Sequence, residues 1–242
     1  TNLPFVPDGE GNLAWRAAKL LLDEKGIRDG VTIKIRKFIP VAAGMAGGST
    51  DAAAVLVGVN RMFDLGFTKK ELMERGVKLG ADVPYCIMRG TALSEGIGEI
   101  LTELPAPPQC HLVIAKPQIS VSTKAVYGKL RVNELAPEEH PDIDGMMESI
   151  KNGDLDGVIG RLGNVLETVT VPDHPEIAEI KKVMMENGAC GSLMSGSGPT
   201  VFGIYKDKEQ AEKACQALRD ADGGRLTRQV YLTEFYNRKK AR

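Results

Sequence analysis

The sequence has few of the residues that build metal centres and disulfide frameworks. Its 242 residues include four cysteines and three histidines, and no Cys-x-x-Cys pair occurs, so the spacing of a metal-ligand set is missing. A formal net charge of −1 gives no support for a nucleic-acid-binding surface, and we interpret the basic tail at 238–242 as a frayed terminus. We therefore expect reduced, buried thiols, no cluster of metal ligands and no nucleic-acid partner.

Long apolar runs are also missing. None approaches the roughly 20 residues that a membrane-spanning helix needs. The chain has 43% apolar and 26% charged residues, which is ordinary for a folded, water-soluble protein, and its length allows one large core or two modest ones. We expect a cytoplasmic protein without a membrane partner.

The most informative stretch is rich in glycine and alanine and covers residues 40–54. Alternating apolar residues at 31–35 predict a strand before it, and the composition of 52–60 predicts a helix after it. Small residues let backbone N–H groups turn toward an anion, and a helix N-terminus adds partial positive charge. The alternative is a flexible connector in which Ser49 or Thr50 merely caps the helix.

This loop lacks the Gly-Lys-Ser/Thr end of a P-loop and the spacing of the dinucleotide fingerprint. It resembles the Pro-x-x-x-Gly-Leu-Gly-Ser-Ser-Ala signature of the GHMP kinases, with Met45 and Ala46 in place of the usual Leu and Gly. The resemblance implies that ATP is the phosphoryl donor and that Ser49 or Thr50 could approach Mg²⁺. It assigns the ATP triphosphate to Pro40, Val41, Ala42, Ala43, Gly44, Met45, Ala46, Gly47, Gly48, Ser49 and Thr50.

A second informative segment is Gly-Ala-Asp-Val-Pro at 80–84. Its lone Asp82 lies between apolar residues, and the proline restricts the backbone of Val83, so we expect a partner to hold the carboxylate. Taken alone, the pattern favours an aspartate that caps a short turn. The segment matches the diphosphocytidyl-methylerythritol kinase branch of the GHMP family residue for residue. This resemblance implies that Asp82 is catalytic and accepts the proton of the substrate hydroxyl.

The nucleotide has three candidate contacts outside this loop. A helix is predicted from Asn12 to Lys25, with Gly26 as its stop. In the family an Asn-Leu pair at this place approaches adenine, which implies such contacts for Asn12 and Leu13, while Asn12 as a plain N-cap is the alternative. Lys37 is a further candidate for the nucleotide, against a solvated lysine at the end of the predicted strand.

Two later segments resemble the parts of the family that meet the substrate. An aromatic at the place of Tyr127 stacks on cytosine there, a contact worth about 1–3 kcal/mol, and the aligned Thr123 lies near the reacting groups. A tyrosine on a helix is otherwise usually packing. The Ser-Gly-Ser-Gly turn within 191–203 resembles the last family motif, which faces the phosphate loop across the domain cleft, and it implies substrate contacts for Ser195 and Gly196.

The resemblance implies an α+β fold of two domains. The first, at 1–108, is the ATP-binding domain of the ribosomal-S5-domain-2-like type, and the second, at 109–242, is ferredoxin-like. A proline-dense connector at 104–109 predicts the boundary. The family's first, lysine-bearing segment has no counterpart here, so we expect the first domain to be truncated at its start and the chain alone to be inactive and prone to aggregate through exposed sheet edges.

The implied activity is transfer of the ATP γ-phosphoryl group to the 2-hydroxyl of 4-diphosphocytidyl-2-C-methyl-D-erythritol, a step of the non-mevalonate isoprenoid pathway, by a monomer or weak homodimer. One alternative is a GHMP kinase for another alcohol, which the segment around Tyr127 argues against. The other is a non-catalytic nucleotide or sugar sensor on the same fold. A sensor does not need a general base, so the presence of Asp82 argues against this alternative.

Overall fold

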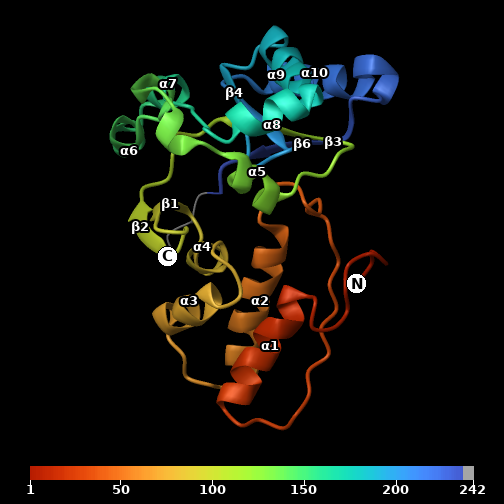
Figure 1. Ribbon diagram of the computed structural model, residues 1–242, viewed down its shortest axis with the longest axis vertical. Helices are drawn as coiled ribbons and strands as arrows, with labels where there is room; N and C mark the ends of the chain where they lie inside the picture. Colours follow the sequence, from red (N-terminus) through yellow and green to blue (C-terminus); the bar gives the residue numbers. More distant parts are fainter. Residues whose placement is uncertain (237–242) are drawn as a thin grey trace. The chain divides into compact units, whose positions relative to one another are not determined.

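The computed structural model describes residues 1–236, and the basic tail at 238–242 lies outside the described part. The chain divides into two compact units, the first made of Thr1–Val41 and Ala46–Glu103 and the second of Ala42–Met45 and Leu104–Arg242 (Figure 1). Both units contain helices and strands, and the predicted α+β class is confirmed. Among the described helices, none is long and apolar enough to cross a membrane.

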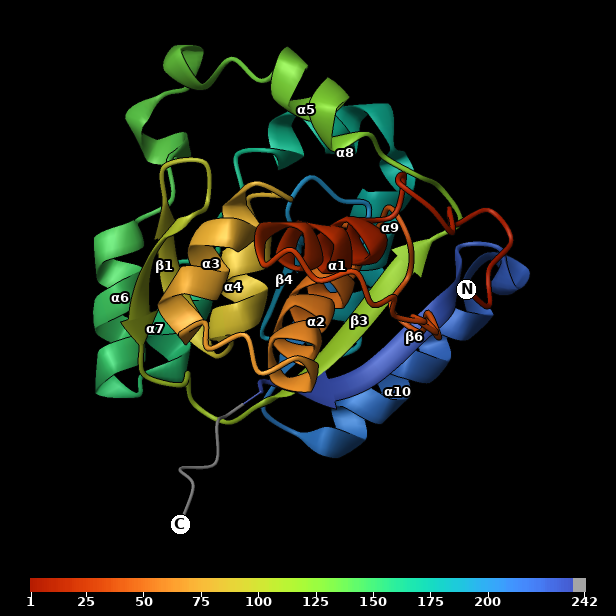
Figure 2. The same cartoon turned by 90° about the horizontal axis from the view of Figure 1, so that it is seen from below.

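The first unit is mainly helical. Its elements are α1 (Leu13–Glu24), α2 (Gly47–Met62), α3 (Lys69–Val77), α4 (Val83–Met88) and a hairpin of β1 (Thr91–Glu95) and β2 (Ile100–Leu104). Helices α1 and α2 lie side by side in both views (Figure 1, Figure 2). Ala17 and Leu21 of α1 are fully buried against Ala52 and Leu56 of α2, and Val83 of α4 completes this core. Small alanines allow the two helix backbones to approach closely.

The strand predicted over 31–35 is not formed, and this prediction is wrong. Side chains from Val31 to Ile39 do alternate between partly buried and exposed, and Val31 and Ile33 pack against the core of the first unit. No strand in the described part of the chain pairs with this segment. The alternation therefore specifies an extended backbone with one apolar face, whereas a strand also needs hydrogen bonds from a neighbour.

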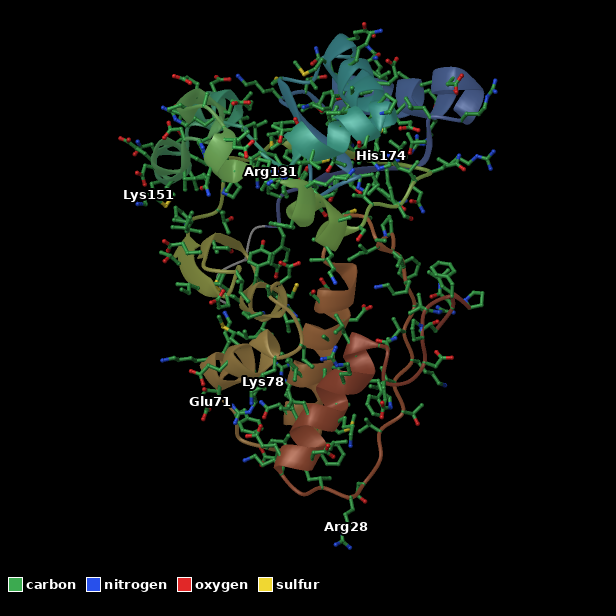
Figure 3. The ribbon with its side chains drawn as sticks, in the orientation of Figure 1. Arg28, Glu71, Lys78, Arg131, Lys151 and His174 are labelled. Atoms are coloured by element: carbon green, nitrogen blue, oxygen red, sulfur yellow. The ribbon has the colours of Figure 1, made fainter. Side chains whose placement is uncertain are left out.

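Capping residues determine where two of these helices begin. The side chain of Asn12 accepts a hydrogen bond from Ala14 N at 2.9 Å and so starts α1, and Gly26 follows the helix with a φ of 62°. Thr68 and Glu71 form a capping box at the start of α3, and Figure 3 labels Glu71 on this helix.

Helix α4 is one that the sequence pattern does not predict. Pro84 disfavours the helical conformation for Val83 before it, yet a proline in the first turn of a helix removes no intrahelical hydrogen bond. The segment predicted as a turn is therefore the start of a short helix, with Asp82 at the N-cap position.

The second unit contains a sheet and most of the remaining helices. Its elements are β3 (His111–Pro117), α5 (Thr123–Lys129), η1 (Val132–Glu134), η2 (Pro137–Glu139), α6 (Ile143–Asn152), α7 (Leu155–Gly160), α8 (Glu167–Asp173), α9 (Pro175–Glu186), β4 (Gly191–Met194), β5 (Val201–Tyr205), α10 (Lys208–Asp220), η3 (Ala221–Gly224) and β6 (Thr227–Glu234). Helix α7 ends at Gly160 and α8 begins only at Glu167, because the glycines at 160 and 163 disfavour a continuous helix.

The sheet has the strand order β4-β5-β3-β6, and all its neighbours are antiparallel. Val113 in β3 is opposite Gly203 of β5 and Leu232 of β6. Val113, together with Ile177 and Ile180 of α9, is fully buried in the core that α9 and α10 form against one face of the sheet. Figure 2 shows α10 running beside β3 and β6.

Candidate functional site

The glycine-rich loop ends earlier than the sequence suggests. Helix α2 begins at Gly47 rather than near residue 52, so Gly47 and Thr50 belong to its first turn. The N-cap is Ala46, which has a left-handed backbone and no side chain that could cap the helix. The alternative that Ser49 or Thr50 caps the helix is therefore wrong. Among the described residues, no side chain caps the first backbone N–H groups of this 16-residue helix, which favours an anion at this end.

The loop backbone before this helix is unusual. Ala42, Gly44 and Ala46 have φ values of 51°, 68° and 48°, a left-handed conformation that alanine rarely adopts. Left-handed residues at alternate positions turn successive N–H groups toward one side and form a concavity that suits an anion. Strain of this kind persists where the surrounding structure enforces it, commonly at ligand-binding loops.

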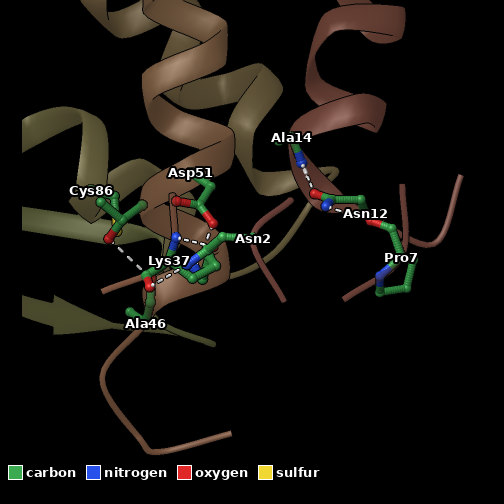
Figure 4. Close-up of polar contacts among 9 residues, drawn as sticks. Asn2, Pro7, Asn12, Ala14, Lys37, Ala46, Asp51 and Cys86 are labelled. Atoms are coloured by element: carbon green, nitrogen blue, oxygen red, sulfur yellow. Dashed lines mark hydrogen bonds and ion pairs between the residues drawn. The ribbon is translucent and has the colours of Figure 1, made fainter. Parts of the chain in front are cut away.

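Lys37 lies beside the first turn of α2. Its Nζ forms an ion pair with Asp51 Oδ2 at 2.6 Å, and only 6% of its side chain is exposed (Figure 4). The backbone N of Lys37 donates to Asn2 Oδ1 at 2.7 Å, and its Nζ lies so close to Gly47 that a Cβ there would be 3.3 Å away. The alternative of a solvated lysine is wrong, because the ammonium group is buried at the predicted phosphate site.

Of the Asn12–Leu13 pair, Leu13 adjoins the same turn. Its side chain lies next to Gly48, where an added Cβ would be 3.6 Å from Leu13 Cδ1. The Asn12 amide donates to Pro7 O at 2.7 Å and accepts from Ala14 N, so its side chain caps α1 as in the alternative interpretation (Figure 4). Two of the three predicted nucleotide contacts, Leu13 and Lys37, therefore lie beside the start of α2.

Asp82 is exposed at the N-cap position of α4, and its carboxylate makes no hydrogen bond that caps this helix. Within residues 1–236 it also has no ion-pair or hydrogen-bond partner. The expectation that a partner holds this carboxylate is therefore wrong, and so is the alternative of a capping side chain. An exposed carboxylate without a partner remains available to a substrate.

Cys86, one turn after Asp82, connects α4 to the start of α2. Its Sγ is 3.5 Å from Thr50 Oγ1, which itself donates to Ala46 O at 3.0 Å. Because the one hydrogen of the Thr50 hydroxyl is donated to Ala46 O, the Cys86 thiol is the donor to Thr50. Burial raises the pKa of this thiol above its usual value. Neither Cys86 nor Asp51 was predicted from the sequence. The position of Cys86 depends on α4 being a helix, and the role of Asp51 depends on the burial of Lys37.

Within the second unit, the middle of the loop contacts the Ser-Gly-Ser-Gly turn. Ser195 Oγ donates to Gly44 O at 2.9 Å, and a Cβ on Gly44 would collide with the backbone oxygen of Ser195. Only glycine allows this close approach. The motif predicted to face the loop across a cleft contacts residues 42–45 directly, and these residues belong to the same unit as the turn.

Two predicted substrate residues lie on α5. Thr123 Oγ1 is 2.9 Å from Ser197 Oγ, which connects the start of α5 to the turn. Tyr127 lies one turn further along, and 61% of it is exposed. The alternative of a packing tyrosine is wrong, because so exposed a ring contributes little to a core.

Comparison with known proteins identifies the family. Residues 12–90 match the GHMP kinases N terminal domain, and residues 146–223 match the GHMP kinases C terminal model. A 4-diphosphocytidyl-2-C-methyl-D-erythritol kinase of Lachnospira eligens is 54% identical over 98% of this chain and 80% of its own length. One from Alkaliphilus metalliredigens is 49% identical over 99% of this chain and 80% of its own.

Solved structures agree with this result. A 4-(cytidine 5'-diphospho)-2C-methyl-D-erythritol kinase superposes with a TM-score of 0.78 at 32% identity, covering 94% of this chain and 79% of its own. A homoserine kinase from Cytophaga hutchinsonii has a TM-score of 0.80 at 22% identity, covering 95% of this chain and 78% of its own, and it shows the shared fold alone. The chain therefore belongs to the GHMP kinases, which are ATP-dependent small-molecule kinases, and within them to the 4-diphosphocytidyl-2-C-methyl-D-erythritol kinases.

Proposed function

We propose that this chain transfers the γ-phosphoryl group of ATP to the 2-hydroxyl of 4-diphosphocytidyl-2-C-methyl-D-erythritol. The observation that carries the proposal is the 54% identity, over 98% of the chain, to the Lachnospira eligens enzyme of that name. The reaction consumes ATP, so we place it in the cytoplasm, and we expect a monomer or weak homodimer.

Phosphoryl transfer asks a protein mainly for positioning and for stabilisation of charge. In this proposal, residues 40–50 bind the triphosphate of ATP through the strained loop and the first turn of α2. Asn12, Leu13 and Lys37 contact the rest of the nucleotide. The buried ammonium of Lys37 lies beside Gly47, and its ion pair with Asp51 fixes its position there.

Asp82 accepts the proton of the attacking hydroxyl. Its carboxylate is exposed and has no partner within the described residues, so no hydrogen bond has to break before it acts. A carboxylate is a weak base, so the proton of the attacking hydroxyl transfers late, as the new P–O bond forms. Ser195, Gly196 and Thr123 contact the substrate near the reacting groups in this proposal, and Tyr127 stacks on its cytosine.

Mg²⁺ is the second cofactor of the proposal. It prefers oxygen ligands and in kinases is held by nucleotide phosphates with only one or two protein groups. The described residues fit that mode, since they offer hydroxyls at the start of α2 and no cluster of three or more His, Cys, Asp or Glu. Thr50 already donates to Ala46 O, whereas the Ser49 hydroxyl makes no hydrogen bond within residues 1–236. Ser49 is therefore the better ligand. A bound Mg²⁺ supplies neutralisation of phosphate charge.

An acceptor-dependence assay tests the proposal. Purified protein is incubated with ATP, Mg²⁺ and 4-diphosphocytidyl-2-C-methyl-D-erythritol, homoserine or mevalonate, and ADP and phosphorylated alcohol are quantified. We expect one ADP for each phosphorylated product, with the cytidine-bearing alcohol only. Equal turnover of homoserine or mevalonate would indicate another GHMP kinase, and ATP binding without any turnover would indicate a sensor.

Tyr127 provides a test of the substrate assignment. Replacement of Tyr127 by alanine should raise the KM for the cytidine-bearing alcohol by about 5- to 100-fold, the cost of one lost stacking contact, and should leave the KM for ATP unchanged. Tyr127→Phe should behave like the native enzyme, because the ring face makes the contact. Tyr236, which is 63% exposed in the same unit, provides the matched control Tyr236→Ala. Identical kinetics for the alanine and phenylalanine variants of Tyr127 would remove it from the substrate site.

A further inference from the structure

The turn that contacts the phosphate loop is held by side chains from a stretch in which the sequence predicts no chemistry. Asn164 Nδ2 donates to Met194 O at 2.9 Å and to Gly196 O at 2.8 Å. Its Oδ1 accepts from Leu166 N at 3.0 Å. Both amide hydrogens and the amide oxygen of Asn164 are therefore in use, which fixes the orientation of the side chain.

Glu167 and Thr170 of α8 hold the same turn from its other side. Glu167 Oε1 accepts from Met194 N at 2.7 Å, while its Oε2 pairs with Lys181 of α9 at 2.6 Å. Thr170, which is only 1% exposed, donates its hydroxyl to Ser197 O at 3.2 Å. Carboxylate hydrogen bonds to backbone N–H groups are among the stronger ones, so this end of the turn is firmly anchored.

These contacts add to the turn's own backbone hydrogen bonds, from Ser195 N to Thr200 O at 2.8 Å and from Gly198 N to Ser195 O at 2.9 Å. Gly196 and Gly198 have left-handed φ values of 55° and 82°, and the carbonyl groups of Met194, Gly196 and Ser197 point to side chains from 164–170. From this fixed position Ser195 donates to Gly44 O. A chain of hydrogen bonds thus runs from Asn164 through the turn to the centre of the phosphate loop.

We propose that Asn164 and Glu167 are positioning residues for ATP, which act by fixing the 194–197 turn that holds the Gly44 carbonyl. Within residues 1–236, neither side chain forms a hydrogen bond with the loop, and both act through Ser195. The inference rests on the proposed function, since it assumes that the loop binds the ATP phosphates. It assigns a role in nucleotide binding to the start of α8 and the segment before it.

A double-mutant cycle between Asn164 and Ser195 tests this coupling. We expect Asn164→Ala and Ser195→Ala each to raise the Kd and the KM for ATP about tenfold, because a misplaced loop loses several phosphate contacts at once. If Asn164 acts through Ser195, the double variant should be at most about twofold worse than the more damaged single variant, since coupled residues are not additive. The Kd for ATP, measured without the alcohol, is the decisive quantity, because Ser195 and Gly196 also belong to the proposed substrate site.

Asn164→Asp distinguishes the effect of the hydrogen bonds that Asn164 donates to the turn from the effect of the one that it accepts from Leu166 N. The aspartate keeps the acceptor for Leu166 N but loses both donors to the turn, so it should weaken ATP binding as much as alanine does. Asn60→Ala is the matched control. Asn60 also forms two hydrogen bonds, to the O and N of Phe67 at 2.9 and 3.1 Å, at the opposite end of α2 from the loop. The Asn60→Ala variant should therefore lower the free energy of unfolding without changing the affinity for ATP.

The outcomes distinguish this inference from the proposed function. ATP affinity is measured by isothermal titration calorimetry as well as by turnover, on variants whose circular dichroism shows them to be folded at the assay temperature. A native protein that binds ATP but phosphorylates no alcohol would defeat the proposed function, and the binding cycle would still support the inference if the effects are coupled. Multiplicative effects of Asn164→Ala and Ser195→Ala, or native ATP affinity in Asn164→Asp, would overturn the inference.

Discussion

The carboxylate of Asp82 is exposed and has no hydrogen-bond or ion-pair partner within residues 1–236. Asp82→Asn should therefore lower kcat by about 10² to 10⁴, the usual contribution of a general base. Its free energy of unfolding should change by less than about 0.5 kcal/mol, as for surface substitutions in general. Steady-state kinetics and urea unfolding measure the two quantities.

The matched control for this prediction is Asp29→Asn. Asp29 is another exposed aspartate of the first unit, and its replacement should alter neither kcat nor stability. Near-native turnover by Asp82→Asn would remove Asp82 from the reaction.

The Lys37–Asp51 ion pair should contribute to stability as well as to nucleotide binding. Lys37→Met removes the ammonium and leaves Asp51, only 27% exposed, without its partner, which should cost about 1–3 kcal/mol of unfolding free energy. The exposed Lys19–Asp23 pair, with side chains 51% and 62% exposed, offers a control in the same unit, and Lys19→Met should lower the free energy of unfolding much less than Lys37→Met does.

Urea unfolding of both variants gives these values. The double variant Lys37→Met/Asp51→Ala should recover part of the loss, because it no longer leaves a carboxylate without a partner. Equal costs for Lys37→Met and Lys19→Met would show that the Lys37 pair adds no more stability than a surface pair.

At the scale of elements, the sequence predicted best what neighbouring residues determine. The starts of α1 and α3 follow from Asn12 and from the Thr68–Glu71 box, because a cap acts within one turn of its own residue. The extended segment at 31–39 shows where local prediction fails. Its side chains alternate as in a strand, but a strand also needs a hydrogen-bonded neighbouring strand, which only the tertiary structure can supply. Helix α4 was missed because Pro84 is read locally as a breaker.

The capping box of α3 should make this helix sensitive to acid. Hydrogen bonds from the hydroxyl and the backbone N–H of Thr68 lower the pKa of Glu71 below its ordinary value of 4.5. A carboxylate whose pKa is lower in the folded state stabilises the fold above its unfolded pKa, and this contribution is lost as pH falls through the folded pKa. Glu71→Gln keeps a capping-box side chain but cannot titrate.

The stability advantage of the native protein over Glu71→Gln should therefore shrink as the pH is lowered from about 6 to about 3. Urea midpoints measured across this range test the prediction. Glu74→Gln, at an exposed position of the same helix, is the control and should show a constant difference. A gap between the native protein and Glu71→Gln that does not change with pH would argue against a charged cap.

At the scale of the whole molecule, the predicted site residues depend on contacts that no spacing reveals. Ser195 and Gly44 are 151 positions apart yet share a hydrogen bond, and only the order of the motifs along the chain related them beforehand. Lys37 and Asp51 are 14 positions apart, and only Lys37 was predicted as a site residue. Asn164 and Glu167 carry no motif at all, because their role is to satisfy backbone groups of a turn that forms far away in the sequence.

The division into two units leads to a prediction about autonomous folding. The main core of the second unit, from Val113 of β3 to Val230 of β6, lies wholly within residues 104–242, and so do all four strands of its sheet. A piece with its own sheet and core can fold alone. We therefore expect residues 104–242, expressed by themselves, to unfold cooperatively in urea with a stability of about 5 kcal/mol or more.

This piece lacks Gly44, so the hydroxyl of Ser195 exchanges its carbonyl partner for water. Loss of one such hydrogen bond at an exposed site should cost about 1 kcal/mol, too little to prevent folding. Circular dichroism, urea titration and amide hydrogen exchange of the piece measure the result, with the intact chain as control. A non-cooperative transition, or amides of β3 and β5 without protection, would show that the second unit needs the first in order to fold, and the domain boundary proposed at the 104–109 connector would have to be abandoned.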